Sequence, residues 1–180
     1  MSAAPHIALP SGLPGITSAL AYRPETAKPL MELAQILLRG PSTLTPGERE
    51  IMATFVSSRN DCGFCRASHR SAAAHLLEGN YDLVDAVTCD HLSAPISPKL
   101  KALVTIAGKV QQNGKLVTSD DVQAARALGA TDLEIHDTVL IAAAFSMYNR
   151  YVDGLATWTP AEPAMYDLIG EHMARQGYVR

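Results

Sequence analysis

Apolar residues recur along most of this chain at intervals of three and four positions, the spacing that places side chains on one face of an α-helix. In residues 25–39, for example, Leu30, Leu33 and Leu37 share a face. The alternation typical of β-strands is found nowhere in the sequence. The pattern predicts an all-α protein, with helices over residues 25–39, 46–58, 62–79, 81–90, 98–113, 118–128, 131–157 and 161–176.

Two of these helix starts carry a strong local signal. Thr45 is followed three residues later by Glu48, with Pro46 between them, and Thr131 is followed by Glu134. A threonine and a glutamate at this spacing can cap each other's backbone N–H groups, and proline is favoured at the first helical position.

The first 24 residues have a different character. Six prolines and glycines break any helix longer than a turn, so residues 1–24 are expected to form an arm over a neighbouring surface. No later linker is long enough to split the chain. We therefore expect one helical domain over residues 25–180.

The segment 139–147 is apolar on nearly every helical face. A helix of this kind is buried on all sides. It is expected either to be the central helix of the bundle or to be covered by a second subunit, which makes a homo-oligomer an open expectation.

Composition and charge reduce the number of functional classes that fit the chain. The formal net charge is −3 and no basic patch is present, which argues against nucleic-acid binding. No apolar run is long enough to span a bilayer and no cationic leader begins the chain, so we expect no membrane association and a cytoplasmic location. Three cysteines are too few for a secreted disulfide framework, which favours redox or metal chemistry for a close pair.

Cys62 and Cys65 form such a pair at the predicted start of a helix, and His69 follows four residues later. On a helix these three side chains lie near one face. A helix N-terminus and a neighbouring imidazolium both stabilise a thiolate, the form that attacks peroxides and disulfides. A second thiol one turn away can condense with the resulting sulfenic acid.

Two other interpretations of the pair stay open. The cysteines can be small buried hydrophobic residues, or Cys62, Cys65 and His69 can bind zinc with a distant fourth ligand from His136 or Cys89. Cys89 by itself is expected to fill the core. The remaining histidines are expected to be surface residues or to be satisfied by local hydrogen bonds: His75, His91, His136 and His172.

Glu50 lies away from the apolar arc of its helix, so periodicity predicts a solvated side chain. However, Glu50 belongs to a longer pattern: a glutamate is followed by eleven residues and then by Cys-x-x-Cys-x-x-x-His. This pattern resembles the motif of the AhpD-like alkylhydroperoxidase group of the carboxymuconolactone decarboxylase family. The residues 38–79 look like its peroxidase-related branch, as do the late segments 145–150 and 152–155.

This resemblance implies an AhpD-like helical bundle, a homo-oligomer and an antioxidant enzyme that needs no cofactor. It implies that Cys65 is the peroxidatic thiol, that Cys62 is the proton donor and resolving partner, and that Glu50 and His69 form an inward proton relay. The implied substrate is a hydroperoxide, and the implied reductant is a thiol or dithiol of lipoyl or thioredoxin-like type.

One position departs from the family pattern. Many members carry a histidine directly before the second cysteine, where this chain has Phe64. Phenylalanine cannot carry a proton, so the relay is expected to be shorter, or the substrate more apolar. A thiol–disulfide protein or redox sensor without peroxidase activity, using the same pair, remains the alternative function.

Overall fold

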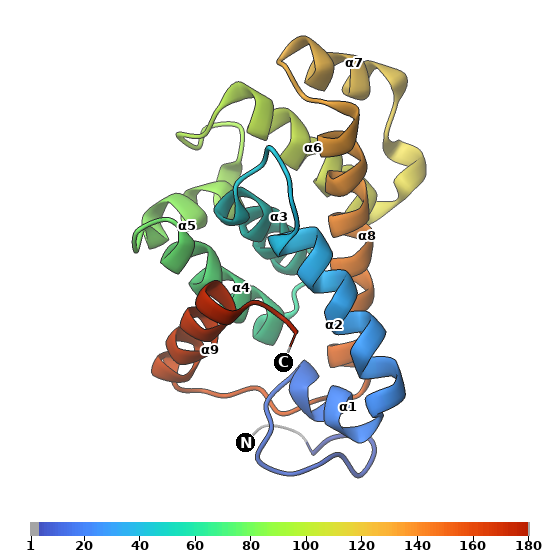
Figure 1. Cartoon of the computed structure of the whole chain (residues 1–180), viewed down its shortest axis with the longest axis vertical. Helices are drawn as coiled ribbons and strands as arrows, with labels where there is room; N and C mark the ends of the chain where they lie inside the picture. Colours follow the sequence, from blue (N-terminus) through green and yellow to red (C-terminus); the bar gives the residue numbers. More distant parts are fainter. Residues whose placement is uncertain (1–3, 180) are drawn as a thin grey trace.

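A computed structural model describes residues 4–179. That part of the chain is entirely helical, with no strand, and the all-α prediction is confirmed. The elements are α1 (Ile16–Tyr22), α2 (Pro24–Arg39), α3 (Pro46–Arg59), α4 (Gly63–Leu76), α5 (Tyr81–Asp90), α6 (Pro98–Gln112), the 3-10 helix η1 (Gly114–Leu116), α7 (Ser119–Ala127), α8 (Asp132–Gly154) and α9 (Pro163–Gln176) (Figure 1).

Each of the eight predicted helices corresponds to one of α2 to α9, and their starts follow the local signals. The Thr45 hydroxyl accepts a hydrogen bond from the Glu48 backbone N–H, and the Glu48 carboxylate accepts one from the Thr45 N–H. Thr131 and Glu134 form the same reciprocal cap. These caps act within four residues, which is why the sequence alone predicts them.

The prediction that no helix longer than one turn forms in the first 24 residues was wrong. The seven residues of α1 contain neither proline nor glycine, and they pack against α2 and α8. The segment before α1 is held to the loop after α8, because the Gly15 N–H donates to the Trp158 carbonyl at 2.8 Å. Residues 1–3 of the expected arm lie outside the described residues.

Helix α3 is the one surrounded on all sides. It packs against α2, α4, α5, α6 and α8, and every residue from Arg49 to Ser57 is buried (Figure 1). Helix α8, expected either to be central or to be covered by a second subunit, leaves part of its surface exposed in the single chain, including Leu133 and Met147. The polar face of α3 therefore meets other helices rather than water.

The second buried glutamate, Glu134, ties three elements together. One carboxylate oxygen accepts hydrogen bonds from the Lys99 amine and the Thr43 hydroxyl, both at 2.7 Å, and the other accepts the Thr131 N–H. Burial acts to raise the pKa of Glu134, but these donors outweigh it and lower the pKa to about 2. The start of α8 is thereby anchored to α6 and to the loop before α3.

Helices α4 and α9 approach closely at Gly170. A Cβ atom there would lie 2.3 Å from Ser71 Oγ and 2.6 Å from the Ala72 nitrogen, so a residue without a side chain is required. The contact directs the end of the chain back towards α2 and α4 (Figure 1). Within residues 4–179 no helix combines the length and apolar character needed to cross a bilayer.

Candidate active site

The cysteine pair lies at the first turn of α4. Cys62 is the N-cap residue and Cys65 the third residue of the helix, and both are buried free thiols. Asp61, in the left-handed region at φ 55°, makes the turn from α3, and the Cys62 N–H donates to the Ser57 carbonyl at 3.1 Å.

No side chain caps α4. The side-chain oxygen of Asn60 is engaged elsewhere, because it accepts from Gln111 Nε2 at 2.8 Å, and its Nδ2 donates to Asn149 Oδ1 at 2.8 Å. The first backbone N–H groups of α4 are therefore left without a side-chain acceptor, and the positive end of the helix dipole lies beside the cysteine pair.

Apolar side chains enclose the thiols. Phe64 and Val152 form a buried cluster with the two cysteines, and Ile16, Tyr166 and Ile169 pack against it. Phe64 itself is fixed between the Tyr166 ring, at a centroid distance of 6.0 Å, and Gly15. A Cβ atom at Gly15 would lie 2.1 Å from the Phe64 ring, so α1 closes over this end of the site.

The two thiols are not equivalent. The Cys62 thiol donates a hydrogen bond to Cys65, which raises the pKa of Cys62 well above its usual value, and burial and the Asp153 carboxylate raise it further. Asp153, near the end of α8, forms a side-chain hydrogen bond with Cys62, and periodicity did not identify it as a site residue. Cys62 is therefore the thiol that keeps its proton.

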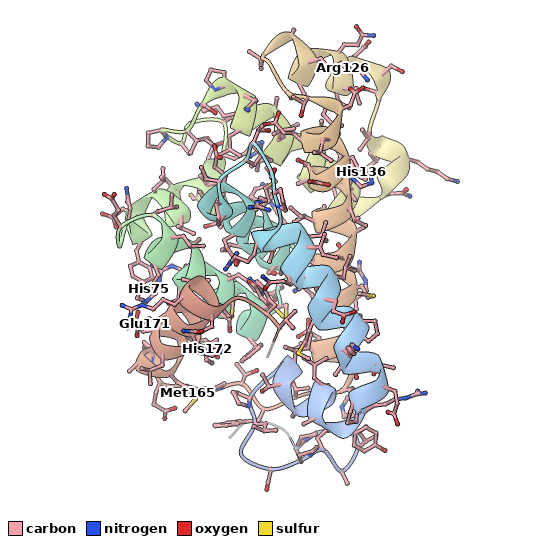
Figure 2. All side chains as sticks on the ribbon, in the orientation of Figure 1. His75, Arg126, His136, Met165, Glu171 and His172 are labelled. Carbon is pink, nitrogen blue, oxygen red and sulfur yellow. The ribbon has the colours of Figure 1, made fainter. Side chains whose placement is uncertain are left out.

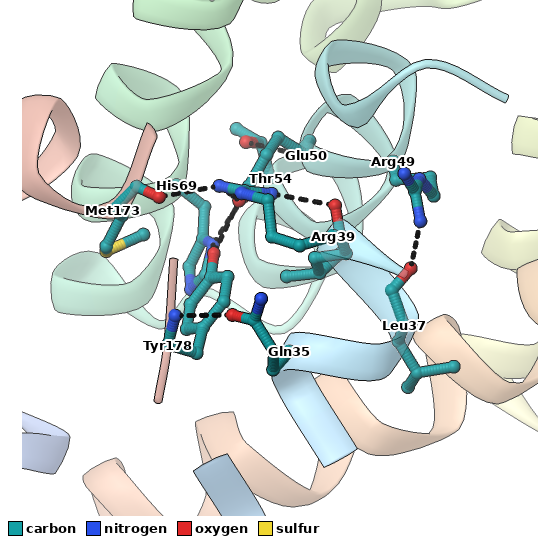
Figure 3. A network of polar contacts seen from close by, with 10 residues as sticks. Gln35, Leu37, Arg39, Arg49, Glu50, Thr54, His69, Met173 and Tyr178 are labelled. Carbon is teal, nitrogen blue, oxygen red and sulfur yellow. Dashed lines mark hydrogen bonds and ion pairs between the residues drawn. The ribbon is translucent and has the colours of Figure 1, made fainter. Parts of the chain in front are cut away.

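Glu50 is completely buried, so the solvated side chain predicted from periodicity was wrong and the inward orientation implied by the family resemblance is observed. Its carboxylate oxygen Oε1 accepts a hydrogen bond from Arg39 Nη2 at 2.6 Å, and Oε2 accepts one from His69 Nδ1 at 2.7 Å (Figure 3). Burial acts to raise the pKa of Glu50, but His69, Arg39 and Tyr178 outweigh it and the pKa falls below its ordinary value. Glu50 is thus an ionised carboxylate inside the protein.

His69 is held on three sides. Its ring meets Phe145 edge-on at 4.6 Å, lies parallel to the Tyr178 ring at 6.1 Å, and donates from Nδ1 to Glu50. The other nitrogen, Nε2, makes no hydrogen bond to any residue of the 4–179 segment, and so it is the atom free to exchange a proton. No hydrogen bond joins His69 to either thiol among these residues, although Cys65 lies four residues earlier on the same helix.

Two residues of this network were not predicted. Arg39 ends α2, and its charge indicates only a favourable helix terminus. Tyr178 follows Gly177, which correctly marks the end of α9, and no local signal indicates that the chain then returns to Glu50. Both reach the site only through the packing of α2 and α9.

An open groove of about 470 Å³ lies beside the thiol site, between α4, α5 and the start of α9. Its lining includes Ala67, Ser71, Tyr81, Tyr166 and Asp167. Because Tyr166 also contacts Phe64, this ring separates the groove from the cysteine cluster.

The other cysteine and the remaining histidines stay outside the site. Cys89 is exposed on α5, so its predicted place in the core was wrong. His75 binds Asp167 and His91 binds Thr105, as expected of locally satisfied residues. Figure 2 shows His75 and His172 at the outer edge of the α4–α9 pair and His136 on the upper part of α8.

The zinc interpretation lacks a ligand set in this part of the chain. Across residues 4–179, no group of three or more histidine, cysteine, aspartate or glutamate side chains is arranged to hold a metal ion. Cys62, Cys65 and His69 therefore do not converge as ligands of one ion.

Of the comparisons with known proteins, the one with solved structures finds similar proteins. No protein-family model matches the chain, and no curated protein matches it. An uncharacterized peroxidase-related protein from Ralstonia eutropha JMP134, with an alkylhydroperoxidase AhpD core, has a similar structure with a TM-score of 0.77 and 26% identity, over 88% of this chain and 82% of that protein.

An uncharacterized peroxidase-related protein from Silicibacter sp. TM1040 is equally similar, with a TM-score of 0.77 and 26% identity over 86% of this chain and 78% of that protein. A protein of unknown function from Agrobacterium tumefaciens has a TM-score of 0.70 at 21% identity, covering 82% of this chain and 99% of its own length, and supports the fold alone. In fold and in sequence, the chain is therefore similar to the AhpD-like, peroxidase-related proteins, which confirms the resemblance first indicated by the spacing of Glu50, Cys62, Cys65 and His69.

Proposed function

We propose that this protein is a cysteine-based peroxidase that reduces organic hydroperoxides through Cys65 and Cys62. The observation that carries the proposal is the hydrogen bond between Glu50 and His69. Glu50 is an ionised, fully buried residue of α3, and His69 lies on α4, the helix that carries the thiols. A buried carboxylate–imidazole pair one helical turn from a cysteine is an arrangement suited to general acid–base activation of a thiol.

The reaction balances with these groups alone. His69 Nε2 takes the Cys65 proton, the thiolate sulfur attacks the terminal peroxide oxygen, and the O–O bond breaks. The departing alkoxide takes the proton held by His69 and leaves as an alcohol. Cys65 is then a sulfenic acid, and the peroxide has been reduced by two electrons.

Cys62 completes the cycle. Its sulfur attacks the Cys65 sulfur, its own proton joins the departing hydroxide as water, and a disulfide forms. The raised pKa of Cys62 supports this role, because a thiol that stays protonated beside Cys65 still has a proton to give. Residues three apart in a first helical turn can meet the geometry that a disulfide needs.

A dithiol must then reduce the disulfide and become oxidised in turn. A lipoyl group or a thioredoxin-like protein supplies two thiols of this kind. Similarity to peroxidase-related proteins supports a hydroperoxide substrate and a thiol reductant in general terms.

The test uses rapid mixing to measure the rate at which tert-butyl hydroperoxide is consumed by the wild-type protein and by two serine variants. Cys65→Ser should abolish the reaction. Cys62→Ser should complete one turnover and leave a sulfenic acid on Cys65 that a dimedone probe labels. Near-wild-type turnover in both variants would exclude the mechanism, and Cys89→Ser, at an exposed cysteine, is the matched control.

The second candidate function is thiol–disulfide exchange without peroxidase activity. Phe64 favours it, because the position that carries a relay histidine in many relatives is here a buried aromatic ring. The two functions differ in the rate at which the wild-type protein reacts with a hydroperoxide. If wild-type protein reacts with the hydroperoxide no faster than a free small-molecule thiol, yet exchanges rapidly with a dithiol, the second function holds.

A further inference from the structure

The end of the chain is directed onto the relay by defined contacts. After α9 the backbone turns at Gly177, whose φ of 74° favours glycine and whose Cβ, if present, would lie 2.4 Å from Gln35 Oε1. The Tyr178 N–H then donates to that same oxygen at 2.8 Å. The turn at Gly177 and the hydrogen bond to Gln35 therefore fix the position of the Tyr178 backbone.

The Tyr178 side chain enters the Glu50–His69 pair directly. Its hydroxyl donates to Glu50 Oε1 and lies 3.4 Å from His69 Nδ1. Its ring lies parallel to the His69 ring, and the Arg39 guanidinium lies over it at 5.1 Å. Figure 3 shows the phenol between the imidazole and the arginine.

The two oxygens of the Glu50 carboxylate have different partners. Among residues 4–179, Oε1 accepts from Arg39 and Tyr178, whereas Oε2 accepts only from His69. The charged and titratable groups that face Glu50 are thus Arg39 from α2, His69 from α4 and Tyr178 from the chain end. Arg49, the preceding residue of α3, also feels the Glu50 charge. Of these, Tyr178 donates from an uncharged hydroxyl.

We propose that Tyr178 is a positioning residue that sets how tightly the Glu50–His69 relay holds a proton. This inference rests on the proposed function for its catalytic meaning, but the hydrogen bonds that carry it do not. By donating to Oε1, the phenol stabilises the negative charge of Glu50 and makes it a weaker acceptor for the His69 proton.

The phenol can act as a donor throughout the physiological pH range. Burial, and then the Glu50 charge, raise the pKa of Tyr178 well above its ordinary value, so the hydroxyl stays protonated. If the hydroxyl is removed, the carboxylate loses one of its donors and becomes more basic. The imidazolium of His69 is then held more tightly, and the relay releases its proton only at higher pH.

The experiment is an NMR titration of the His69 ring in full-length Tyr178→Phe protein, with Tyr151→Phe as the matched control. Phenylalanine keeps the ring beside His69 and removes only the hydroxyl. Tyr151 also loses one hydrogen bond, to the Ala19 carbonyl, but does not touch the relay. We expect the His69 midpoint to rise by about one pH unit in Tyr178→Phe and to stay at the wild-type value in the control.

The pH–rate profile of peroxide consumption should move to higher pH with the titration, which a purely structural role for Tyr178 would not cause. Gly177→Ala, which displaces the chain end without changing the tyrosine, should raise the His69 midpoint in the same way. A His69 midpoint that is equal in Tyr178→Phe and Tyr151→Phe overturns the inference, even if the wild-type protein consumes peroxide. A shifted midpoint in a protein without peroxidase activity would instead retain the inference and reject the proposed function.

Discussion

Two glutamates are fully buried in this protein, and they serve different purposes. Glu134 accepts hydrogen bonds from Lys99, Thr43 and a backbone N–H, so its partners are all groups that join secondary structure elements. Glu50 has an arginine and, in addition, two groups that can exchange protons, His69 and Tyr178. Under the proposed function, the difference between the structural Glu134 and the relay residue Glu50 thus lies in the chemistry of their partners.

Substituting each glutamate by glutamine separates these purposes. Both Glu50→Gln and Glu134→Gln should lower the free energy of unfolding by roughly 3 kcal/mol, because each leaves a buried or half-buried cation without its anion. Only Glu50→Gln should also reduce the rate of peroxide consumption, by about a hundredfold or more, because only Glu50 contacts the imidazole. Denaturant unfolding and initial rates measure the two effects, and an equal loss of rate in both variants would contradict the assignment.

The pH dependence has a definite sign. Both carboxyl pKa values lie below the ordinary 4.5 in the folded protein, that of Glu134 at about 2. Their contribution to stability is therefore present above about pH 4.5 and is lost as the pH falls through the folded-state pKa. The stability difference between the wild type and either glutamine variant should narrow accordingly in acid.

At the scale of elements, the site depends on how closely α9 approaches α4. Gly170 allows this approach, since it lies against Ser71 and the Ala72 backbone. The same helix carries Met173, whose carbonyl accepts from Arg39 at 3.0 Å, and it ends just before Tyr178. A small outward movement of α9 would therefore withdraw several groups from Glu50 together.

Gly170→Ala tests this dependence. The added methyl group has no space, so the variant should lose about 1–3 kcal/mol of unfolding free energy and should show the raised His69 midpoint expected of a displaced Tyr178. Gly154→Ala is the control, because a Cβ atom there meets nothing within 4 Å. Loss of stability in Gly170→Ala without any change at His69 would show that the chain end is positioned independently of α9.

At the scale of the whole molecule, α8 presents an apolar stripe to solvent. Leu133, Leu140, Ala143 and Met147 recur at spacings of seven, three and four residues, and Leu133 and Met147 are 57% and 42% exposed. On the neighbouring α2, Ile36 is 67% exposed. Large apolar side chains gathered on adjoining helices are typical of a surface that another subunit covers, and we propose that it is the homo-oligomer interface.

The double variant Leu133→Glu, Met147→Glu should disrupt this interface. Sedimentation velocity is expected to show wild-type particles larger than the 19.2 kDa chain, and monomers for the variant, because charges at an apolar contact are desolvated without partners. The paired substitution Leu92→Glu, Leu116→Glu places the same charges at exposed leucines outside the stripe and should not change the particle size. Wild-type protein that sediments as a monomer would exclude the proposed interface.

The sequence alone determined what depends on neighbours within a few residues. Helix-period apolar spacing and reciprocal caps, such as Thr45 with Glu48, operate over one or two turns, and so the all-α class and the extents of α2 to α9 were predicted closely. The proximity of Cys62, Cys65 and His69 on one helix follows from the same local geometry. Helix α1 was missed because the prolines and glycines around it outweighed its short, unbroken segment.

Tertiary structure decided what depends on which helix lies beside which. Periodicity assigns a polar residue to solvent, and this fails for Glu50 because α3 is surrounded on every side. No local pattern connects residue 39 or 178 to residue 50, since those contacts arise only when α2, α3 and α9 pack together. The spacing of a motif could thus predict the thiols and their histidine, whereas the ionised carboxylate network that would activate them exists only in the folded chain.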